Sequence, residues 1–154
     1  NDGYDDEVIV VRVNTSPNLY IVLGIYNPET GNYTRCQSIP TTFTRTRTFS
    51  YTGMDLIGDH TNSLIYQGVD DSGNYVMQIF LCREVQGNYE IERIGNFQTD
   101  GTVFIQQTER SESYELSLSK GESYSIWVYE SEKMDEENIN YFYNEYIKFI
   151  DYLI

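Results

Sequence analysis

The sequence has few basic residues and no long apolar segments. It contains 10 Lys and Arg against 24 Asp and Glu, which gives a formal net charge of −14. A charge of this sign repels phosphate backbones and excludes nucleic-acid binding as the main activity. The longest apolar runs, such as Val8–Val11, cover only a few residues. The sequence therefore predicts no transmembrane segment.

Histidine and cysteine are also scarce. His60 is the single histidine, so any Ser-His-Asp or Cys-His arrangement would have to use it, and a catalytic zinc site usually needs several His or Cys ligands. A carboxylate pair for hydrolysis could be drawn from 24 acids, but nothing singles out two of them. Cys36 and Cys82 could pair or stay as buried thiols, because two cysteines are too few to define a disulfide framework. These residues predict a protein that is not an enzyme and require no cofactor.

The residues that are abundant in the sequence favour β structure. Tyr occurs 15 times, and aromatic residues make up 15% of the chain, a composition that suits strands better than a helical bundle. Gly, Asn and Asp separate alternating apolar runs at hairpin spacing. Four hairpins are predicted: Leu19–Tyr26 with Tyr33–Ile39, Ser63–Val69 with Tyr75–Leu81, Gln78–Val85 with Tyr89–Ile94, and Tyr114–Ser119 with Ser123–Tyr129. Gly-Asn-Tyr occurs three times beside these turns, either as turn chemistry or as a decayed repeat.

The two ends of the chain differ from its middle. We expect an acidic tail at residues 1–7, a β domain at 8–130 and a C-terminal amphipathic helix within 131–154. In the last segment apolar residues recur at spacings of three and four, which is the period of a helix. This helix either packs on the sheet or extends from it as a docking surface for a partner. The first residue is Asn, as at a boundary chosen by an experimenter or at a mature terminus left by signal-peptide removal.

The segment Met54–Ile65 carries the most specific pattern. Over about Phe49–Phe97 the chain resembles FG-GAP (VCBS-type) repeats, the blades of integrin-α-like propellers, whose Asp-x-Asp-Gly-Asp-Gly-x-x-Asp-Leu loop wraps a calcium ion. Ile57 replaces the middle aspartate, and His60 replaces the glycine of the tight turn. The resemblance implies a calcium loop, most simply a vestigial one, with four candidate ligands: Asp55, Asp59, Asn62 and Ser63.

Other residues suggest ligand binding without any family pattern. Residues 41–49 alternate as a strand that places Arg45 and Arg47 on one face, either as a cationic spot for an acidic group or as charges that protect a sheet edge. Tyr side chains along the strands, with Tyr66, Tyr75 and Tyr89 as candidates, could form a binding face or pack in the core.

Together these features predict a mainly β, antiparallel, hairpin-rich sheet array with a C-terminal helix. It would resemble one or two propeller blades, or a small sandwich or partial barrel. The function we expect is a non-catalytic binding or adhesion module for a protein or glycan partner. The resemblance to secreted repeat proteins implies an extracytoplasmic place, secreted, periplasmic or at a bacterial cell surface, with a lipoprotein ectodomain as one form. The alternatives are an interaction subunit of a larger secreted assembly and a carboxylate-dependent hydrolase domain.

Overall fold

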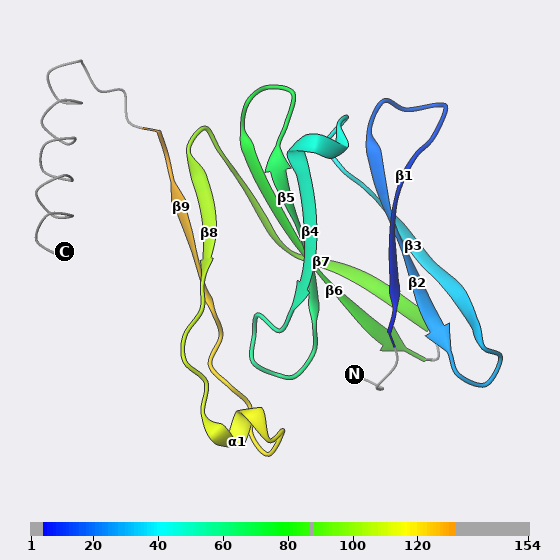
Figure 1. Ribbon diagram of the computed structural model, residues 1–154, viewed down its shortest axis with the longest axis vertical. Helices are drawn as coiled ribbons and strands as arrows, with labels where there is room; N and C mark the ends of the chain where they lie inside the picture. Colours follow the sequence, from blue (N-terminus) through cyan, green and yellow to red (C-terminus); the bar gives the residue numbers. More distant parts are fainter. Residues whose placement is uncertain (1–4, 87, 132–154) are drawn as a thin grey trace, which may run out of the picture.

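The structure is a computed structural model that describes residues 5–86 and 88–131. These residues form antiparallel strand pairs throughout, with one 3-10 helix and one short α-helix (Figure 1), which confirms the prediction of a mainly β architecture. The elements are β1 (Glu7–Arg12), β2 (Leu19–Asn27), β3 (Asn32–Pro40), η1 (Thr46–Thr48), β4 (Phe49–Met54), β5 (Ser63–Val69), β6 (Tyr75–Val85), β7 (Asn88–Thr99), β8 (Thr102–Gln106), α1 (Glu112–Glu115) and β9 (Ser125–Tyr129).

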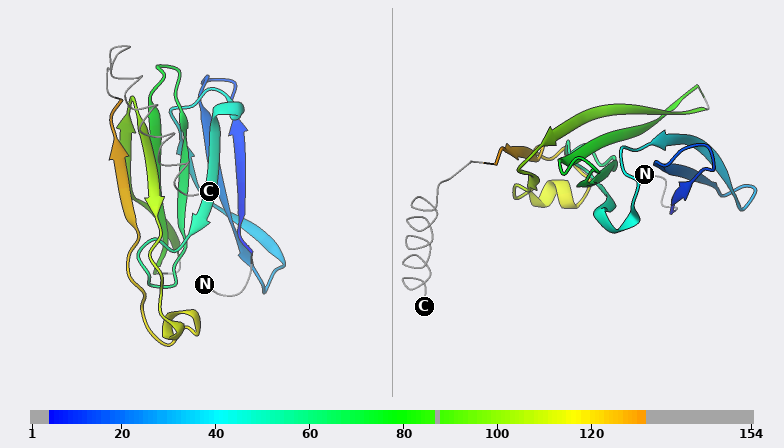
Figure 2. Two further views of the ribbon diagram at one scale, coloured as in Figure 1. Left: turned by 60° about the vertical axis from the view of Figure 1, so that its left-hand side comes forward. Right: turned by 90° about the horizontal axis from the view of Figure 1, so that it is seen from above.

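The described strands form three sheets, with the orders β1-β2-β3, β4-β5-β6-β7 and β8-β9. In Figure 1 the four-stranded sheet lies in the centre, the β8–β9 hairpin on one side and the three-stranded sheet on the other. The two views of Figure 2 keep this order. The molecule is therefore a central sheet flanked by two smaller ones.

Three of the four predicted hairpins are present, as β2–β3, β5–β6 and β6–β7. In the first turn, Asn27 Oδ1 accepts hydrogen bonds from the N–H groups of Glu29 at 2.9 Å and Thr30 at 3.2 Å. In the second, Asp70 Oδ1 accepts one from the N–H of Asn74 at 3.0 Å. These turns were predictable because a short polar side chain fixes its own backbone within a few residues.

The fourth predicted hairpin is wrong. Residues 114–119 do not form a strand. Instead, α1 ends within them at Glu115, and the Ser111 hydroxyl caps this helix by accepting a hydrogen bond from the N–H of Tyr114. Strand β9 pairs with β8, which lies about 20 residues earlier in the chain. The alternating pattern of 114–119 predicted the wrong structure, because a capped helix forms at its start and β9 pairs with the more distant strand β8.

The predicted strand at 41–49 is also wrong before Phe49. The Thr41 hydroxyl donates to the carbonyl of Leu19 at 2.8 Å and accepts from the N–H of Phe43 at 3.2 Å, which bends the chain there. Phe43 is only 1% exposed, and η1 follows it. Hydrogen bonds between the Thr41 side chain and the backbone have replaced the strand pairing that the alternating pattern of 41–49 predicted.

The two faces of the central sheet contribute to two separate cores. Side chains alternate along β6, so Val76 and Phe80 lie on one face and Met77 and Ile79 on the other. The first core joins that sheet to β1–β3 and contains Leu19, Ile21, Leu23, Ile39, Phe43, Tyr66, Val76 and Phe80. The second joins it to β8–β9 and contains Leu56, Ile65, Met77, Ile79 and Val103.

The first described strand begins at Glu7 and the last ends at Tyr129. Most of the predicted acidic tail at 1–7 and all but the first residue of the predicted helical segment 131–154 lie outside the described residues. Within the described part of the chain, no helix has the length and apolar character needed to cross a membrane.

Candidate functional site

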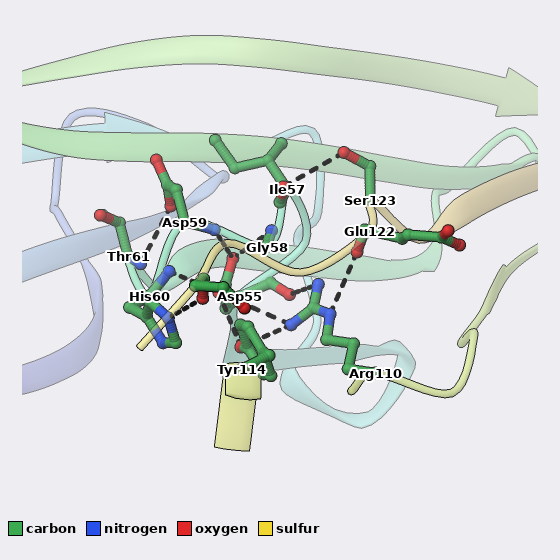
Figure 3. Close-up of polar contacts among 11 residues, drawn as sticks. Asp55, Ile57, Gly58, Asp59, His60, Thr61, Arg110, Tyr114, Glu122 and Ser123 are labelled. Atoms are coloured by element: carbon green, nitrogen blue, oxygen red, sulfur yellow. Dashed lines mark hydrogen bonds and ion pairs between the residues drawn. The ribbon is translucent and has the colours of Figure 1, made fainter. Parts of the chain in front are cut away.

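The loop that resembles a calcium loop joins β4 to β5 and is organised by Asp55. Its Oδ1 accepts hydrogen bonds from the N–H groups of Gly58 at 2.7 Å and Asp59 at 3.2 Å. Its Oδ2 accepts from the N–H of His60 at 2.7 Å and from the Tyr114 hydroxyl at 2.8 Å. Figure 3 shows these donors converging on the carboxylate. Because a carboxylate offers about four acceptor positions, the protein itself occupies the hydrogen-bonding capacity of Asp55.

The cation beside this carboxylate is the guanidinium of Arg110. Its Nη1 lies 3.5 Å from Asp55 Oδ2, and the two side chains are only 3% and 8% exposed. The guanidinium donates to the carbonyl of Asp55 at 2.7 Å, to the carbonyl of Glu122 at 3.0 Å and to the Tyr114 hydroxyl at 2.6 Å. Its carbon lies 4.5 Å from the ring centroid of Tyr114 and 3.9 Å from that of Tyr124. An arginine thus supplies the positive charge of this loop.

A second segment lies across the loop and binds it through the backbone. The N–H of Gly121 donates to the carbonyl of Gly58, and the N–H of Tyr124 donates to the carbonyl of Leu56, both at 2.8 Å. Gly58 has a φ of +78°, and a Cβ at this position would lie 2.2 Å from the Gly121 carbonyl oxygen. Both the conformation and the close approach require glycine at position 58.

His60 closes the loop on its other side. Its φ is 67°, in the left-handed region that favours glycine. Its ring stacks on Tyr114 with 4.4 Å between centroids, and its Nε2 lies 2.9 Å from the Ser119 carbonyl oxygen. The side chain therefore anchors the loop to the segment after α1, although the backbone takes the conformation expected of a glycine.

These contacts shift the pKa values of the Asp55 carboxyl and the Tyr114 hydroxyl. Desolvation on its own would raise the pKa of Asp55, but hydrogen bonds from Tyr114, His60 and Gly58 and the charge of Arg110 outweigh it, so the pKa is lowered. The hydrogen bond to Asp55 raises the pKa of the Tyr114 hydroxyl. The network therefore holds an ionised carboxylate, a neutral phenol and a guanidinium together.

The four candidate calcium ligands have different surroundings. Asp59 Oδ1 accepts a hydrogen bond from the N–H of Thr61 at 3.0 Å, and Asn62 is exposed. Ser63 is fully buried within the sheet. Within residues 5–86 and 88–131, no three His, Cys, Asp or Glu residues are grouped so that they could hold a metal ion. Because the Asp55 oxygens are occupied and a guanidinium lies beside them, these residues do not fit a calcium ion.

The other predicted ligand-binding residues are scattered. Arg45 and Arg47 are exposed around η1, in the irregular chain before β4, and do not project from a strand. Tyr66 is 0% exposed, and burial raises the pKa of its hydroxyl to about 12. Tyr75 is half-buried against the second core, whereas Tyr89 is 39% exposed on β7. These tyrosines therefore do not share a binding face.

Tyr66 lies inside because its polar end has a partner there. Its hydroxyl donates to Gln78 Oε1 at 2.6 Å, and Gln78 Nε2 donates to Asn96 Oδ1 at 2.8 Å. This row crosses β5, β6 and β7 on the face that packs against β1–β3. A hydrogen-bonded row of this kind lets a tyrosine serve as a core residue.

Sequence reasoning missed an exposed set of aromatic rings on the β8–β9 hairpin. Phe104, Trp127 and Tyr129 are 43%, 46% and 47% exposed. The rings of Phe104 and Tyr129 are 5.6 Å apart at 9°, and those of Trp127 and Tyr129 are 6.4 Å apart at 17°. We call these three residues the aromatic strip. Alternation along each strand could have placed them outward, but only the β8–β9 pairing brings them together.

The hairpin that carries the aromatic strip is fixed at one end. The Thr99 hydroxyl donates to the carbonyl of Tyr129 at 2.8 Å, and Asp100 accepts hydrogen bonds from the N–H and hydroxyl of Ser131 at 3.0 and 2.5 Å. These contacts join the end of β9 to the turn between β7 and β8. The rings therefore project from a backbone that is held in place before any ligand arrives.

Comparison of the chain with known protein families, with curated proteins and with solved structures gives no match.

Proposed function

We propose that this protein is a non-catalytic extracytoplasmic binding module that recognises a neutral glycan through the aromatic strip. The observation that carries the proposal is the set of three nearly parallel rings, each close to half exposed, on the outer face of one hairpin. Exposed aromatic side chains that lie next to one another are typical of binding surfaces rather than of a solvated sheet.

The surroundings of the strip favour a sugar over a protein side chain. A pyranose ring presents C–H groups on its flat face, which stack on aromatic rings, and hydroxyls around its edge, which need hydrogen-bonding partners. On the same outward face lie Thr102, beside Tyr129, and the cross-strand pair of Gln106 and Ser125. All three are exposed. Their hydroxyl and amide groups can therefore bind sugar hydroxyls at both ends of the strip.

The charge of the protein selects the kind of glycan. The outward face of the hairpin carries no charged side chain between Thr102 and Gln106 on β8 or between Ser125 and Tyr129 on β9. The whole chain has a formal net charge of −14. Sulfated or carboxylated sugars would be repelled and would find no cation on this face. We therefore propose a neutral glycan.

The location and the family assignment rest on the sequence pattern. The resemblance of Phe49–Phe97 to FG-GAP repeats supports a secreted or cell-surface protein of bacterial type with an adhesive role. In this proposal the Asp55 loop keeps the shape of a blade loop and uses Arg110 in place of an ion, so that millimolar calcium leaves the melting temperature unchanged. The sequence of segment 131–154, with apolar residues at helical spacing, supports a role in binding a protein partner in a larger assembly.

The test uses the fact that the chain contains a single tryptophan, which lies in the strip. We expect the emission of Trp127 to shift when soluble neutral cello-, xylo-, manno- or galacto-oligosaccharides are titrated into the full chain. Tyr129→Ala and Phe104→Ala keep the fluorophore and should weaken binding at least about tenfold, because each removes one stacking surface.

The matched control is Tyr51→Ala, which removes an aromatic ring that is 45% exposed on β4, away from the strip. It should leave the titration unchanged. If none of the oligosaccharides changes the emission of Trp127, glycan recognition is wrong and the protein-interaction alternative stands. If Tyr51→Ala weakens binding as much as Tyr129→Ala does, the aromatic strip is not the site.

A further inference from the structure

The two cysteines of the chain come from the two sheets that the first core joins. Cys36 lies on β3 of the three-stranded sheet and Cys82 on β6 of the central sheet. Both are thiols and both are half-buried. They are 46 positions apart in the sequence, so their meeting is a result of the tertiary fold alone.

Contacts on β7 show where they meet. The Cys36 thiol donates to the carbonyl of Tyr89 at 3.4 Å. On the β6–β7 ladder Tyr89 lies opposite Glu84, and the next pair on the same face is Ile91 opposite Cys82. Cys36 and Ile91 both pack against the first core. Each thiol influences the pKa of the other, which agrees with this placement.

The thiols differ in their surroundings. Cys36 lines an open cavity of about 460 Å³ together with Tyr89, Asn88 and Arg35, so this residue borders a space that a small molecule can enter. Burial raises the pKa of both thiols, and that of Cys82 reaches about 12, with Cys36 and Asp6 as further causes. Both thiols therefore carry little thiolate at neutral pH, and Cys36, which borders the cavity, is the one we expect to react first, slowly and faster as the pH rises.

We propose that Cys36 and Cys82 are an oxidative modification site, at which a small disulfide such as oxidised glutathione converts the two thiols into a disulfide between β3 and β6. The Cys36 thiolate attacks one sulfur of oxidised glutathione, forms a mixed disulfide and releases one glutathione. The Cys82 thiolate then attacks the Cys36 sulfur and releases the second glutathione. The protein gives up two electrons and two protons, and one oxidised glutathione becomes two reduced ones.

This inference does not rest on glycan binding, because the thiols lie in the core opposite to that of the β8–β9 hairpin. The disulfide would tie the three-stranded sheet to the central sheet across a long loop of chain. Such a link restricts the unfolded chain and raises stability, provided that the two sulfurs can reach bonding distance without moving the sheets. It would persist only in an oxidising compartment, in keeping with the proposed extracytoplasmic location.

The test incubates the reduced full chain with oxidised glutathione. We expect an Ellman assay to detect two free thiols before the incubation and none after it, and the mass to decrease by two hydrogens. A non-reducing peptide map should contain one peptide pair linked through Cys36 and Cys82. The melting temperature should rise by about 5 °C or more and return to its starting value on reduction.

Single-cysteine variants separate the two steps. Cys82→Ser should accumulate a stable glutathione adduct on Cys36, whereas Cys36→Ser should react several times more slowly, because Cys82, whose pKa is raised to about 12, is the thiol left. Two thiols that persist at equilibrium, a glutathione adduct that stays on the wild-type chain, or a disulfide-linked dimer would each overturn the proposal. The peptide map of the wild-type chain shows whether Cys36 and Cys82 are linked, even if a variant fails to fold.

Discussion

The Asp55 loop and the aromatic strip differ in how much of their side chains remains exposed to solvent. In the loop, a carboxylate and a guanidinium are 8% and 3% exposed, and protein groups occupy their hydrogen-bonding positions. In the strip, three aromatic rings are each more than 40% exposed. The loop with the more specific sequence pattern uses its two buried charges within the protein, whereas the hairpin with no pattern leaves its rings exposed.

The difference follows from desolvation. A buried charge must regain in protein hydrogen bonds what it loses from water, so polar groups that fold inward become occupied by one another. Aromatic rings lose little when they are left half exposed, and they keep their faces available. A polar cluster in a loop is therefore a weaker sign of a binding site than an exposed aromatic surface on a fixed hairpin.

The largest expected effect comes from removing the cation of the loop. Arg110→Met should lower the free energy of unfolding by about 3–5 kcal/mol, because it leaves the Asp55 carboxylate buried without a counter-charge. The control is Arg83→Met, which breaks a 3.7 Å ion pair with Glu92 whose side chains are 59% and 61% exposed. That change should cost less than about 1 kcal/mol. Equal losses in urea unfolding would show that Arg110 is not the structural cation of the loop.

The second largest effect on stability is expected at Gly58, where the β4–β5 loop lies against segment 121–124. Gly58→Ala should cost about 2 kcal/mol more than Gly73→Ala. Both glycines have positive φ, at +78° and +84°, but a Cβ at Gly58 meets the Gly121 carbonyl, whereas one at Gly73 meets nothing within 4 Å. Thermal unfolding of the two variants measures the difference. Similar melting temperatures would mean that segment 121–124 does not hold the loop closely.

A third effect is the pH dependence of stability. The pKa of Asp55 is lowered in the folded protein, so the folded carboxylate binds protons more weakly than the unfolded one, whose pKa is about 3.9. The stabilisation is therefore present in full above that value and is lost as the pH falls through the folded pKa. Between about pH 5 and about pH 2, wild-type stability to urea should fall more steeply than that of Asp55→Asn. Glu92→Gln, which removes one carboxylate of the exposed Arg83–Glu92 pair, serves as the comparison and should keep the wild-type slope. If Glu92→Gln flattens the pH dependence as much as Asp55→Asn does, the assignment to Asp55 is wrong.

The smallest effect on stability is expected in the strip. Phe104→Ala should lower the free energy of unfolding by about 1 kcal/mol or less, since its ring stays 43% exposed. Phe43→Ala, the same change at a position 1% exposed, should cost about 3–5 kcal/mol. Chemical denaturation of both variants checks the contrast. A large loss at Phe104 would mean that the strip serves the core and not a ligand.

Local chemistry explains which parts of the fold were predictable. Asn27 and Asp70 fix their own turns, so the hairpins around them follow from a few neighbouring residues. Residues 114–119 alternate like a strand, yet Ser111 caps a short helix there and β9 finds its partner in β8. The alternating Leu116 and Leu118 are 61% and 77% exposed, because no strand pairs with this segment and no sheet covers them.

The candidate site was harder to predict for a related reason. Asp55 was recognisable as the centre of its loop, but its partner Arg110 lies 55 positions away and belongs to no pattern in the sequence. Tyr66 and Trp127 are both aromatic residues within alternating strands, and nothing in their neighbours shows that one is buried and the other exposed. Which face of a strand is covered depends on the sheet that packs against it.

Composition and contacts within a few residues account for the acidic charge, for three of the hairpins and for the turn that Asp55 makes. Four other features depend on packing between sheets: the place of Arg110 beside Asp55, the burial of Tyr66, the approach of Cys36 to β7, and the single surface formed by Phe104, Trp127 and Tyr129. Each of these joins residues distant in the chain, and the burial of apolar faces between sheets selects such contacts without leaving a local sequence pattern.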